Sequence, residues 1–293
     1  IELDRIYARA YAGLSAALEL LPYFGGIPAD SIREPAITAA RRALALDSTL
    51  AEAHTSMALA YMHGNQWGES ELEHRRAIAL DPGDAAAHVQ YGRLLLGTGR
   101  FTDASREFDW AESLDPFSPV AAAWISVIAL LSGQQGAALA AARRAVALDS
   151  STGPALNALT RAFLAAGQPD SAIAVADRLP RVPPWTGIRA YVHAKAGDPA
   201  TARRIVREIE ARRPLPWAGG FSIAWAMLGL GDTARALAAL ERSTDAHEIW
   251  PSWFTLFDGV YEDVRASPRF AAVARRVGLD VGRFTAPRSA GPR

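Results

Sequence analysis

The sequence repeats most clearly over residues 80–115, which read LDPGDAAAHVQYGRLLLGTGRFTDASREFDWAESLD. This stretch begins and ends on Leu-Asp, and the same dipeptide stands at Leu46-Asp47 and Leu148-Asp149, so that successive copies are 34 residues apart. A repeat of this length is typical of one helix–turn–helix unit, which cannot bury its apolar face alone and has to stack on its neighbours. The spacing therefore predicts an all-α fold, a right-handed α-solenoid of about eight helix–turn–helix units.

Glycines provide a second measure of the period. Gly99, Gly133, Gly167, Gly197 and Gly231 follow one another at steps of 34, 34, 30 and 34 residues. Glycine is common where a helix ends in a left-handed residue, so each of these positions is expected to end the first helix of a unit. The short step before Gly197 includes three prolines in residues 179–184, and it predicts that the second helix of that unit is shortened.

Small and large residues alternate within the unit in a recognisable order. Tyr91 and Gly92 stand in the first helix, and the second helix carries Ala104, Phe108 and Ala111 before Asp115-Pro116 ends the unit. This order resembles the tetratricopeptide repeat. The preceding unit departs from it at Ser70 and His74, where that repeat usually has Ala and an aromatic residue.

The layout of the whole chain resembles the C-terminal repeat region of bacterial multidomain regulators. The resemblance rests on residues 7–14, 40–47, 267–270 and 275–279. In those proteins a winged-helix DNA-binding, adenylate-cyclase or serine/threonine-kinase domain precedes a tetratricopeptide array. The output domain is not among these 293 residues, so the resemblance implies a fold and leaves the cellular role open.

Four segments are expected along the chain. Residues 1–50 form an N-terminal capping unit, in which a long loop at 22–32 separates helices at 6–21 and 33–46. Residues 51–244 form the repeat array, and residues 245–280 form C-terminal capping helices. Residues 281–293 form a tail rich in Gly, Pro and Arg. Atypical end units are expected because the ends of an array face solvent.

Charge is unevenly distributed although the chain is neutral overall. Residues 1–150 carry a net charge of −6 and residues 151–293 a net charge of +6, and Lys195 is the only lysine. There is no Cys, which excludes disulfides and cysteine metal sites. No uncharged apolar run reaches the 18 residues of a transmembrane segment. Because the chain begins without Met, it is expected to be a fragment or a processed product, and the compartment, bacterial cytoplasm or periplasm, stays unknown.

The resemblance to the tetratricopeptide repeat implies that the first helix of each unit lines a concave groove. Transferring its register gives a mixed surface of apolar anchors and cations, on which Arg93, Arg161 and Lys195 would bind carboxylates. The predicted groove residues are Thr55, Leu59, Met62, His63, Val89, Arg93, Leu96, Val127, Asn157, Arg161, Tyr191, Lys195, Phe221 and Trp225.

Two aromatic groups are alternative docking sites. Tyr23 and Phe24 belong to the expected N-terminal loop, and Trp250 and Trp253 belong to the aromatic segment near the C-terminus. Each group either fills the core of a capping unit or forms an exposed surface for a partner. The sequence leaves both alternatives open.

Signatures of catalysis are missing. His54 and His88 occupy one repeat position, which predicts a structural role, and no pair of histidines has the spacing of a zinc hydrolase. No catalytic residue, metal or cofactor is therefore expected, and no nucleic-acid recognition motif is found. The sequence predicts a non-catalytic protein–protein interaction scaffold that binds a peptide or protein through its groove. The alternative is a structural accessory subunit, held in a larger complex by its loop, caps and edges and in peripheral contact with a membrane if that complex is membrane-bound.

Overall fold

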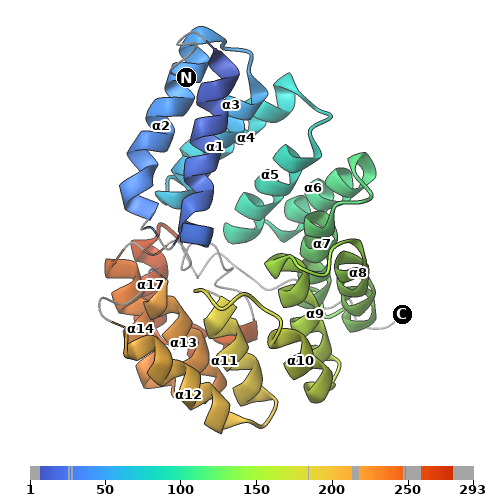
Figure 1. Ribbon diagram of the computed structural model, residues 1–293, viewed down its shortest axis with the longest axis vertical. Coiled ribbons are helices and arrows are strands. Elements are labelled where there is room, and N and C mark those ends of the chain that lie inside the picture. The colour runs from blue at the N-terminus through green and yellow to red at the C-terminus, as the bar shows by residue number, and fades with distance from the viewer. Residues whose placement is uncertain are drawn as a thin grey trace. The chain divides into compact units, whose positions relative to one another are not determined.

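The computed structural model describes residues 7–25, 27, 29–183, 185–212, 218–246, 248 and 259–279 (Figure 1). These residues form helices and connecting turns, without a strand among them. The chain divides into two compact units, residues 1–114 and 115–293. The predicted all-α fold is confirmed.

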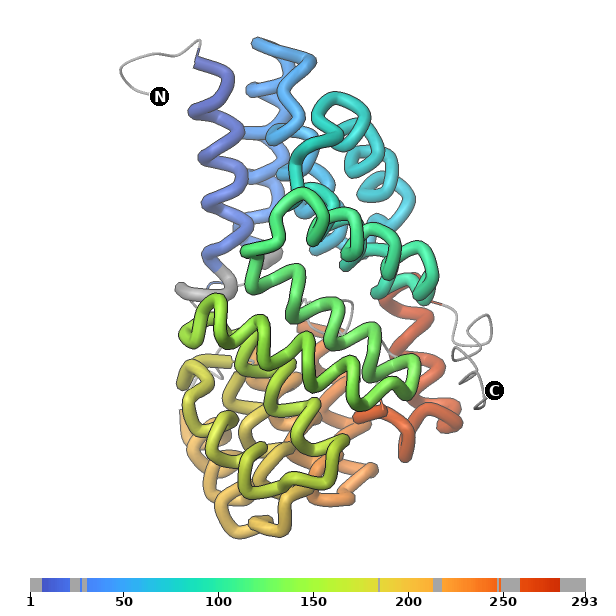
Figure 2. Tube along the Cα trace, turned by 90° about the vertical axis from the view of Figure 1, so that its right-hand side faces the viewer, coloured from blue at the N-terminus to red at the C-terminus, as the bar shows by residue number. Residues whose placement is uncertain are grey.

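Unit 1 consists of three helix pairs. They are α1 (Ala8–Gly25) with α2 (Ala29–Leu46), α3 (Ala51–His63) with α4 (Trp67–Leu80), and α5 (Ala85–Gly97) with α6 (Phe101–Leu114). The two helices of each pair pack against each other, and each pair stacks on the next (Figure 2).

Unit 2 continues the pattern with four pairs and ends in short helices. The pairs are α7 (Pro119–Leu131) with α8 (Gln135–Leu148), α9 (Gly153–Ala165) with α10 (Pro169–Ala176), α11 (Trp185–Lys195) with α12 (Pro199–Glu210), and α13 (Gly219–Gly229) with α14 (Thr233–Asp245). The 3-10 helix η1 (Gly259–Tyr261), α16 (Glu262–Arg265) and α17 (Pro268–Arg276) follow, and α17 packs on α14. Seven described pairs and this terminal group agree with the expected number of about eight units.

The repeated Leu-Asp dipeptide closes the turn between one pair and the next. The carboxylates of Asp47, Asp81, Asp115 and Asp149 accept hydrogen bonds from the backbone N–H two residues later, at 2.9, 3.1, 3.0 and 2.8 Å. Such a bond replaces a backbone turn and directs the chain into the following helix. The 34-residue period is therefore the period of this aspartate turn.

The five predicted turn glycines all adopt positive φ, between 68° and 93°. At the first of them, the N–H of Arg100 donates to the carbonyl of Leu95 at 2.8 Å and the N–H of Gly99 to that of Leu96 at 3.1 Å, which satisfies carbonyls at the helix end. Asn65, at φ 58°, takes this place between α3 and α4. Asn is the residue other than Gly that tolerates the left-handed region best.

Helix α10 is shorter than the other second helices. It has 8 residues, whereas α8 has 14. The chain then passes through Pro180 and Pro183 before α11 begins at Trp185. The predicted shortening before Gly197 is confirmed, and it follows from prolines that cannot donate the hydrogen bonds of a longer helix.

The expected loop at residues 22–32 is wrong. Helix α1 continues through Pro22 to Gly25, and α2 begins at Ala29, so each helix has 18 residues. Proline removes one helical hydrogen bond, and the extensive packing of α1 against α2 compensates for that loss. Pro35 likewise lies inside α2.

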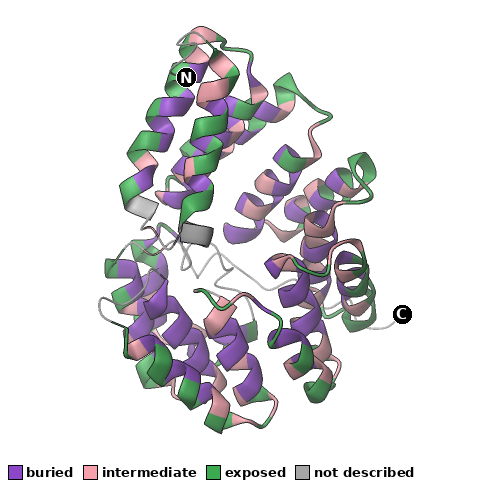
Figure 3. Ribbon diagram, in the orientation of Figure 1, coloured by how far each residue is buried: buried purple, intermediate pink, exposed green. Residues whose placement is uncertain are grey.

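Residue sizes compensate where the two helices of a pair cross. A Cβ atom on Gly92 would lie 2.6 Å from the ring of Phe108, so this crossing requires glycine. One repeat earlier, Ala58 and His74 occupy the same two positions. A slightly larger small residue is thus combined with a smaller ring, and all four residues are buried. Figure 3 shows buried positions along the helices of both units.

His74 is fully buried, and neither of its ring nitrogens has a hydrogen-bond partner among the described residues. Burial lowers the pKa of His74 from 6.5 to about 3, with a smaller contribution from the charge of Arg93. The ring is therefore neutral in the folded chain at neutral pH.

Helix α13 receives its N-terminal cap from a residue far along the chain. It begins after Ala218, which has φ 58° and provides no side-chain cap. The Glu248 carboxylate accepts the N–H of Phe221 at 2.9 Å, the N–H of Gly220 at 3.3 Å and the hydroxyl of Ser243 at 2.6 Å. Burial raises the pKa of Glu248, and these hydrogen bonds oppose the rise only in part. Glu248, which follows α14 in the sequence, thus caps α13.

Candidate functional site

All predicted groove residues lie on the first helix of a pair, but they differ in accessibility. Lys195 is exposed. Thr55, Leu59, Arg93, Arg161 and Tyr191 are half-buried. Met62, His63, Val89, Leu96, Val127, Asn157, Phe221 and Trp225 are buried. The accessible members in unit 2 are therefore Arg161, Tyr191 and Lys195, two cations and an aromatic.

Many of the groove residues share one repeat position. Leu59, Arg93, Val127, Arg161, Tyr191 and Trp225 each stand six residues before the left-handed residue that ends their helix. This regularity survives the short step before Gly197, because α11 keeps its spacing from the turn although α10 is shortened.

A series of aromatic side chains in contact with one another extends from the surface of unit 2 into its interior. The Nζ atom of Lys195 lies 5.8 Å from the centroid of the Tyr191 ring. The Tyr191 and Trp225 rings pack edge to face, with their centroids 5.7 Å apart. Trp225 donates its indole N–H to the Tyr261 hydroxyl at 2.8 Å, and Tyr261 lies 5.4 Å from Phe270 on α17. Lys195 thus stands over the outer ring of a packed core, an arrangement that favours a cation electrostatically.

Phe221 and Trp225 belong to this core. Both side chains are fully buried, and their ring centroids are 5.6 Å apart. In this conformation they support α11 and α13 from inside. Contact between these two residues and a partner stays a prediction.

His54, His63 and His88 in unit 1 each pair with a carboxylate, whereas His74 does not pair with one among the described residues. His63 contacts the carboxylate of Glu19 on α1, and both side chains are almost completely buried. Nδ1 of His54 lies 2.6 Å from Glu73, and Nδ1 of His88 lies 2.7 Å from Glu107. In each pair the two residues come from different helices, which agrees with the predicted structural role of His54 and His88. Within the described residues no group of three or more His, Asp and Glu side chains is placed to hold a metal ion.

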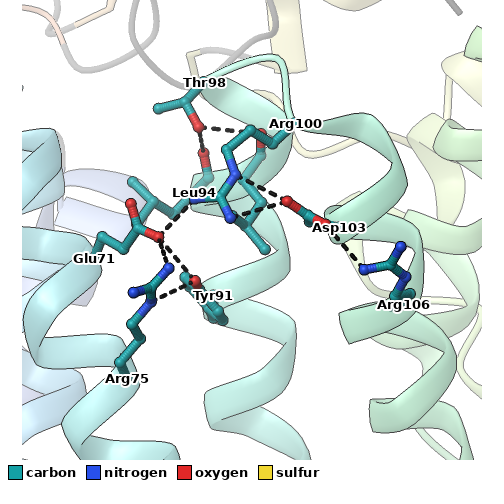
Figure 4. A network of polar contacts seen from close by, with 9 residues as sticks. Glu71, Arg75, Tyr91, Leu94, Thr98, Arg100, Asp103 and Arg106 are labelled. Carbon is teal, nitrogen blue, oxygen red and sulfur yellow. Dashed lines mark hydrogen bonds and ion pairs between the residues drawn. The ribbon is translucent and has the colours of Figure 1, made fainter.

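A charged network joins the second and third helix pairs of unit 1 (Figure 4). The Oε1 atom of Glu71 accepts from Arg100 at 2.6 Å, from Arg75 at 2.7 Å and from the Tyr91 hydroxyl at 3.0 Å. Partial burial alone would raise the pKa of Glu71, but the hydrogen bonds from Arg100 and Tyr91 hold that pKa below its ordinary value. The network fixes α5, which carries Arg93, against α4.

The exposed aromatic residues that were not predicted as candidates include Trp110 and Phe117, besides Tyr7. Trp110 on α6 is 56% exposed, and Phe117 in the turn after α6 is 79% exposed. Trp110 occupies the repeat position of Arg76 and Arg144, both of which face solvent. An aromatic residue at a solvent-facing repeat position was therefore a signal already present in the sequence.

The alternative docking residues cannot be placed in the same way. Trp250 and Trp253 lie outside the described residues. Tyr23 and Phe24 belong to α1, but their side chains lie outside the described part. Docking through these four residues stays a prediction.

A model of the tetratricopeptide repeat family matches residues 90–153 and 189–252. These two segments, 128 of the 293 residues, are similar to tetratricopeptide repeats. The two matches lie on either side of the shortened repeat that contains α10. No curated protein matches the chain significantly. The regulator-like layout stays a prediction.

Solved structures share the fold. A tetratricopeptide repeat protein from Parabacteroides merdae is similar with a TM-score of 0.55 and 10% identity, over 92% of this chain and 99% of that one. PilF of Pseudomonas aeruginosa is similar with a TM-score of 0.54 and 17% identity, over 71% of this chain and 92% of that one. PilW, a type IV pilus biogenesis factor, is similar with a TM-score of 0.53 and 21% identity, over 69% of this chain and 94% of that one. Identities this low show the fold alone. Among the described helices of the repeat chain, none has the length and apolarity needed to cross a membrane.

Proposed function

We propose that this tetratricopeptide-repeat chain is a non-catalytic scaffold that binds a protein or peptide partner through the first helices of unit 2. The observation that carries the proposal is the exposed Lys195 ammonium over the Tyr191 ring, on a helix that packs beside the one bearing Arg161. An ordered cation above an aromatic core loses little conformational entropy when a carboxylate binds.

The charge of the chain favours an acidic partner at this surface. Residues 151–293 carry a net charge of +6, and the accessible groove residues of unit 2 are Arg161, Tyr191 and Lys195. A field of one sign raises the association rate of a segment of the opposite sign. We infer a partner segment in which carboxylates alternate with apolar side chains, bound by shape and distributed contacts without any bond chemistry.

A second function is favoured by a different observation. Trp110, on the second helix of a pair in unit 1, and Phe117, in a turn of unit 2, are large, exposed aromatic residues, and neither belongs to a first helix. Exposed aromatics mark interaction sites more often than chance surface positions do. They support the alternative of a structural subunit held permanently in a larger complex by its edges. The likeness to PilW, described as a type IV pilus biogenesis factor, is compatible with either role.

The test compares three variants by capture of native partners after cross-linking with carboxylate- or arginine-reactive reagents, since Lys195 is the only lysine. Arg161→Glu with Lys195→Glu should release the partner and leave the helical circular dichroism unchanged. The matched control is Arg106→Glu with Arg204→Glu, which reverses two exposed cations on α6 and α12 and should retain it.

The edge variant is Trp110→Ser with Phe117→Ser. Loss of the partner from this variant alone would identify the accessory-subunit function. Retention by both the groove and the edge variants would refute both proposals.

A further inference from the structure

A pocket of about 550 Å³ lies between α12 and the turn that joins α13 to α14. One wall is a single face of α12, formed by Arg203, Val206, Arg207 and Glu210. The opposite wall is formed by Met227, Leu230, Gly231, Asp232 and Arg235. The volume falls within the range of about 300–1,000 Å³ that is typical of ligand sites. Met227 lies on the first helix α13, but none of the nine lining residues is a predicted groove residue.

The floor of this pocket is apolar. Val206 and Met227 are buried at 3% and 2% exposure, and Leu230 beside them is half-buried. Apolar side chains at the bottom of a pocket favour an apolar group of a ligand, because that group leaves water when it binds.

The rim of the pocket is cationic. Arg235 donates to Glu210 at 3.0 Å, so these two charges neutralise each other at one end. The Asp232 carboxylate accepts the N–H of Arg235 as the cap of α14. Arg203 and Arg207 are exposed, stand one helical turn apart, and take part in no ion pair within the described residues.

Comparison with the neighbouring Arg204 shows that Arg203 and Arg207 are unusual in having no acidic residue four positions later on their helix face. Arg204 points to another face of α12 and forms an ion pair with Glu208 at 2.7 Å, four residues later. The residue four positions after Arg203 is Arg207, a like charge, and like charges at this spacing destabilise a helix slightly. The two guanidinium groups are therefore placed to share an anion that the described chain does not supply.

We propose that this pocket, named here the α12 pocket, binds an acidic protein segment in which a carboxylate stands next to an apolar side chain. The apolar side chain occupies the floor at Val206 and Met227. The carboxylate lies between Arg203 and Arg207, whose planar donors suit bidentate recognition. This site is independent of the proposed groove, so that the chain can hold two segments of a partner.

The experiment is selection from a random twelve-residue peptide library on the full chain. Selected peptides are then labelled with fluorescein, and their affinity is measured by fluorescence anisotropy for the wild type, for Arg203→Glu with Arg207→Glu, and for a matched control. The control, Arg204→Glu with Arg275→Glu, reverses two exposed arginines outside the pocket. Circular dichroism checks that all the variants keep their helicity.

The expected result is enrichment of peptides with Asp or Glu next to Leu, Ile, Phe or Met. Their affinity should fall about tenfold or more in the pocket variant, because both arginines that face the peptide carboxylate become glutamates and repel it. In the control the affinity should fall less than about twofold. Binding should persist in Arg161→Glu with Lys195→Glu. Half-displacement of these peptides should need inorganic phosphate at a concentration more than about tenfold above the peptide Kd, because phosphate leaves the apolar floor empty.

Three outcomes would overturn the proposal. The first is a selection without acidic–apolar enrichment, and the second is equal affinity for the pocket variant and the wild type. The third is half-displacement by phosphate at a concentration near the peptide Kd, which would identify a plain anion site. Loss of binding in the groove variant alone would refute the α12 pocket while leaving the scaffold function intact.

Discussion

His74 makes the folded chain sensitive to acid. Its ring is fully buried, and burial lowers its pKa to about 3, whereas the unfolded chain binds the proton near pH 6.5. Above pH 6.5 both states are neutral at this residue, and its contribution to stability is complete. As the pH falls from 6.5 towards 3, only the unfolded state gains a proton, so the free energy of unfolding decreases by about 1.4 kcal/mol per pH unit.

The acid sensitivity caused by His74 can be removed by introducing the two residues found at the same positions of the next repeat. Ala58→Gly with His74→Phe reproduces the Gly92 and Phe108 pair, in which the ring occupies the space of the missing Cβ. Between pH 6 and pH 4 the wild type should lose about 2.5 kcal/mol more of its free energy of unfolding than this variant, because the other titrating groups cancel in the difference.

Urea unfolding at pH 6, 5 and 4, followed by far-ultraviolet circular dichroism, measures this difference. The same samples give the titration of the His74 ring by nuclear magnetic resonance, with an expected midpoint near pH 3. A stability difference that stays constant across these pH values, or a ring that titrates near pH 6.5, would refute the reasoning.

Three further changes test the packing and the caps. Gly92→Ala should cost about 1–3 kcal/mol in urea unfolding because its Cβ meets the Phe108 ring, whereas Gly136→Ala, where nothing lies within 4 Å, should stabilise by up to about 1 kcal/mol; equal effects would contradict the crossing geometry. Glu248→Ala should cost about 1–3 kcal/mol by leaving two N–H groups of α13 without a partner, and Glu248→Gln should cost less, so a harmless Ala variant would argue against the cap. Asn65→Gly should be neutral or stabilising and Asn65→Ala destabilising by about 1 kcal/mol in thermal unfolding, a ranking that would be reversed if the left-handed turn did not form.

Much of the fold was predictable because the decisive interactions are local. The aspartate turn and the glycine turn each involve residues less than six positions apart, so a period in the sequence translates directly into a period of turns. The shortened α10 was predictable for the same reason, since proline acts on its own helix.

The errors concern properties that depend on distant residues. Pro22 looked like the end of a helix, but packing of α1 on α2 keeps that segment helical. The cap from Glu248 reaches α13 across 27 residues, which no local pattern indicates.

The α12 pocket shows the same limit. Sequence spacing alone assigns Arg203 and Arg207 to a solvated helix face. The pocket beside them exists because the end of α13 and the start of α14 form its second wall. Likewise, the repeat register places a residue on the first helix of a pair but does not say whether it is accessible, as the buried Phe221 and the exposed Lys195 illustrate.

Lys195 also makes the surface of unit 2 chemically addressable. Since every other basic side chain is arginine or histidine, an amine-reactive dye can attach only to this residue and to the chain's α-amino group. At mildly acidic pH the α-amino group reacts preferentially, and at higher pH the lysine joins it, so the two labels can be separated. A fluorophore on the exposed Lys195 would sit beside the half-buried Tyr191 ring. Because acylation removes the charge of Lys195, a loss of partner binding after labelling would test the proposed contact at one known atom, without mutating the chain.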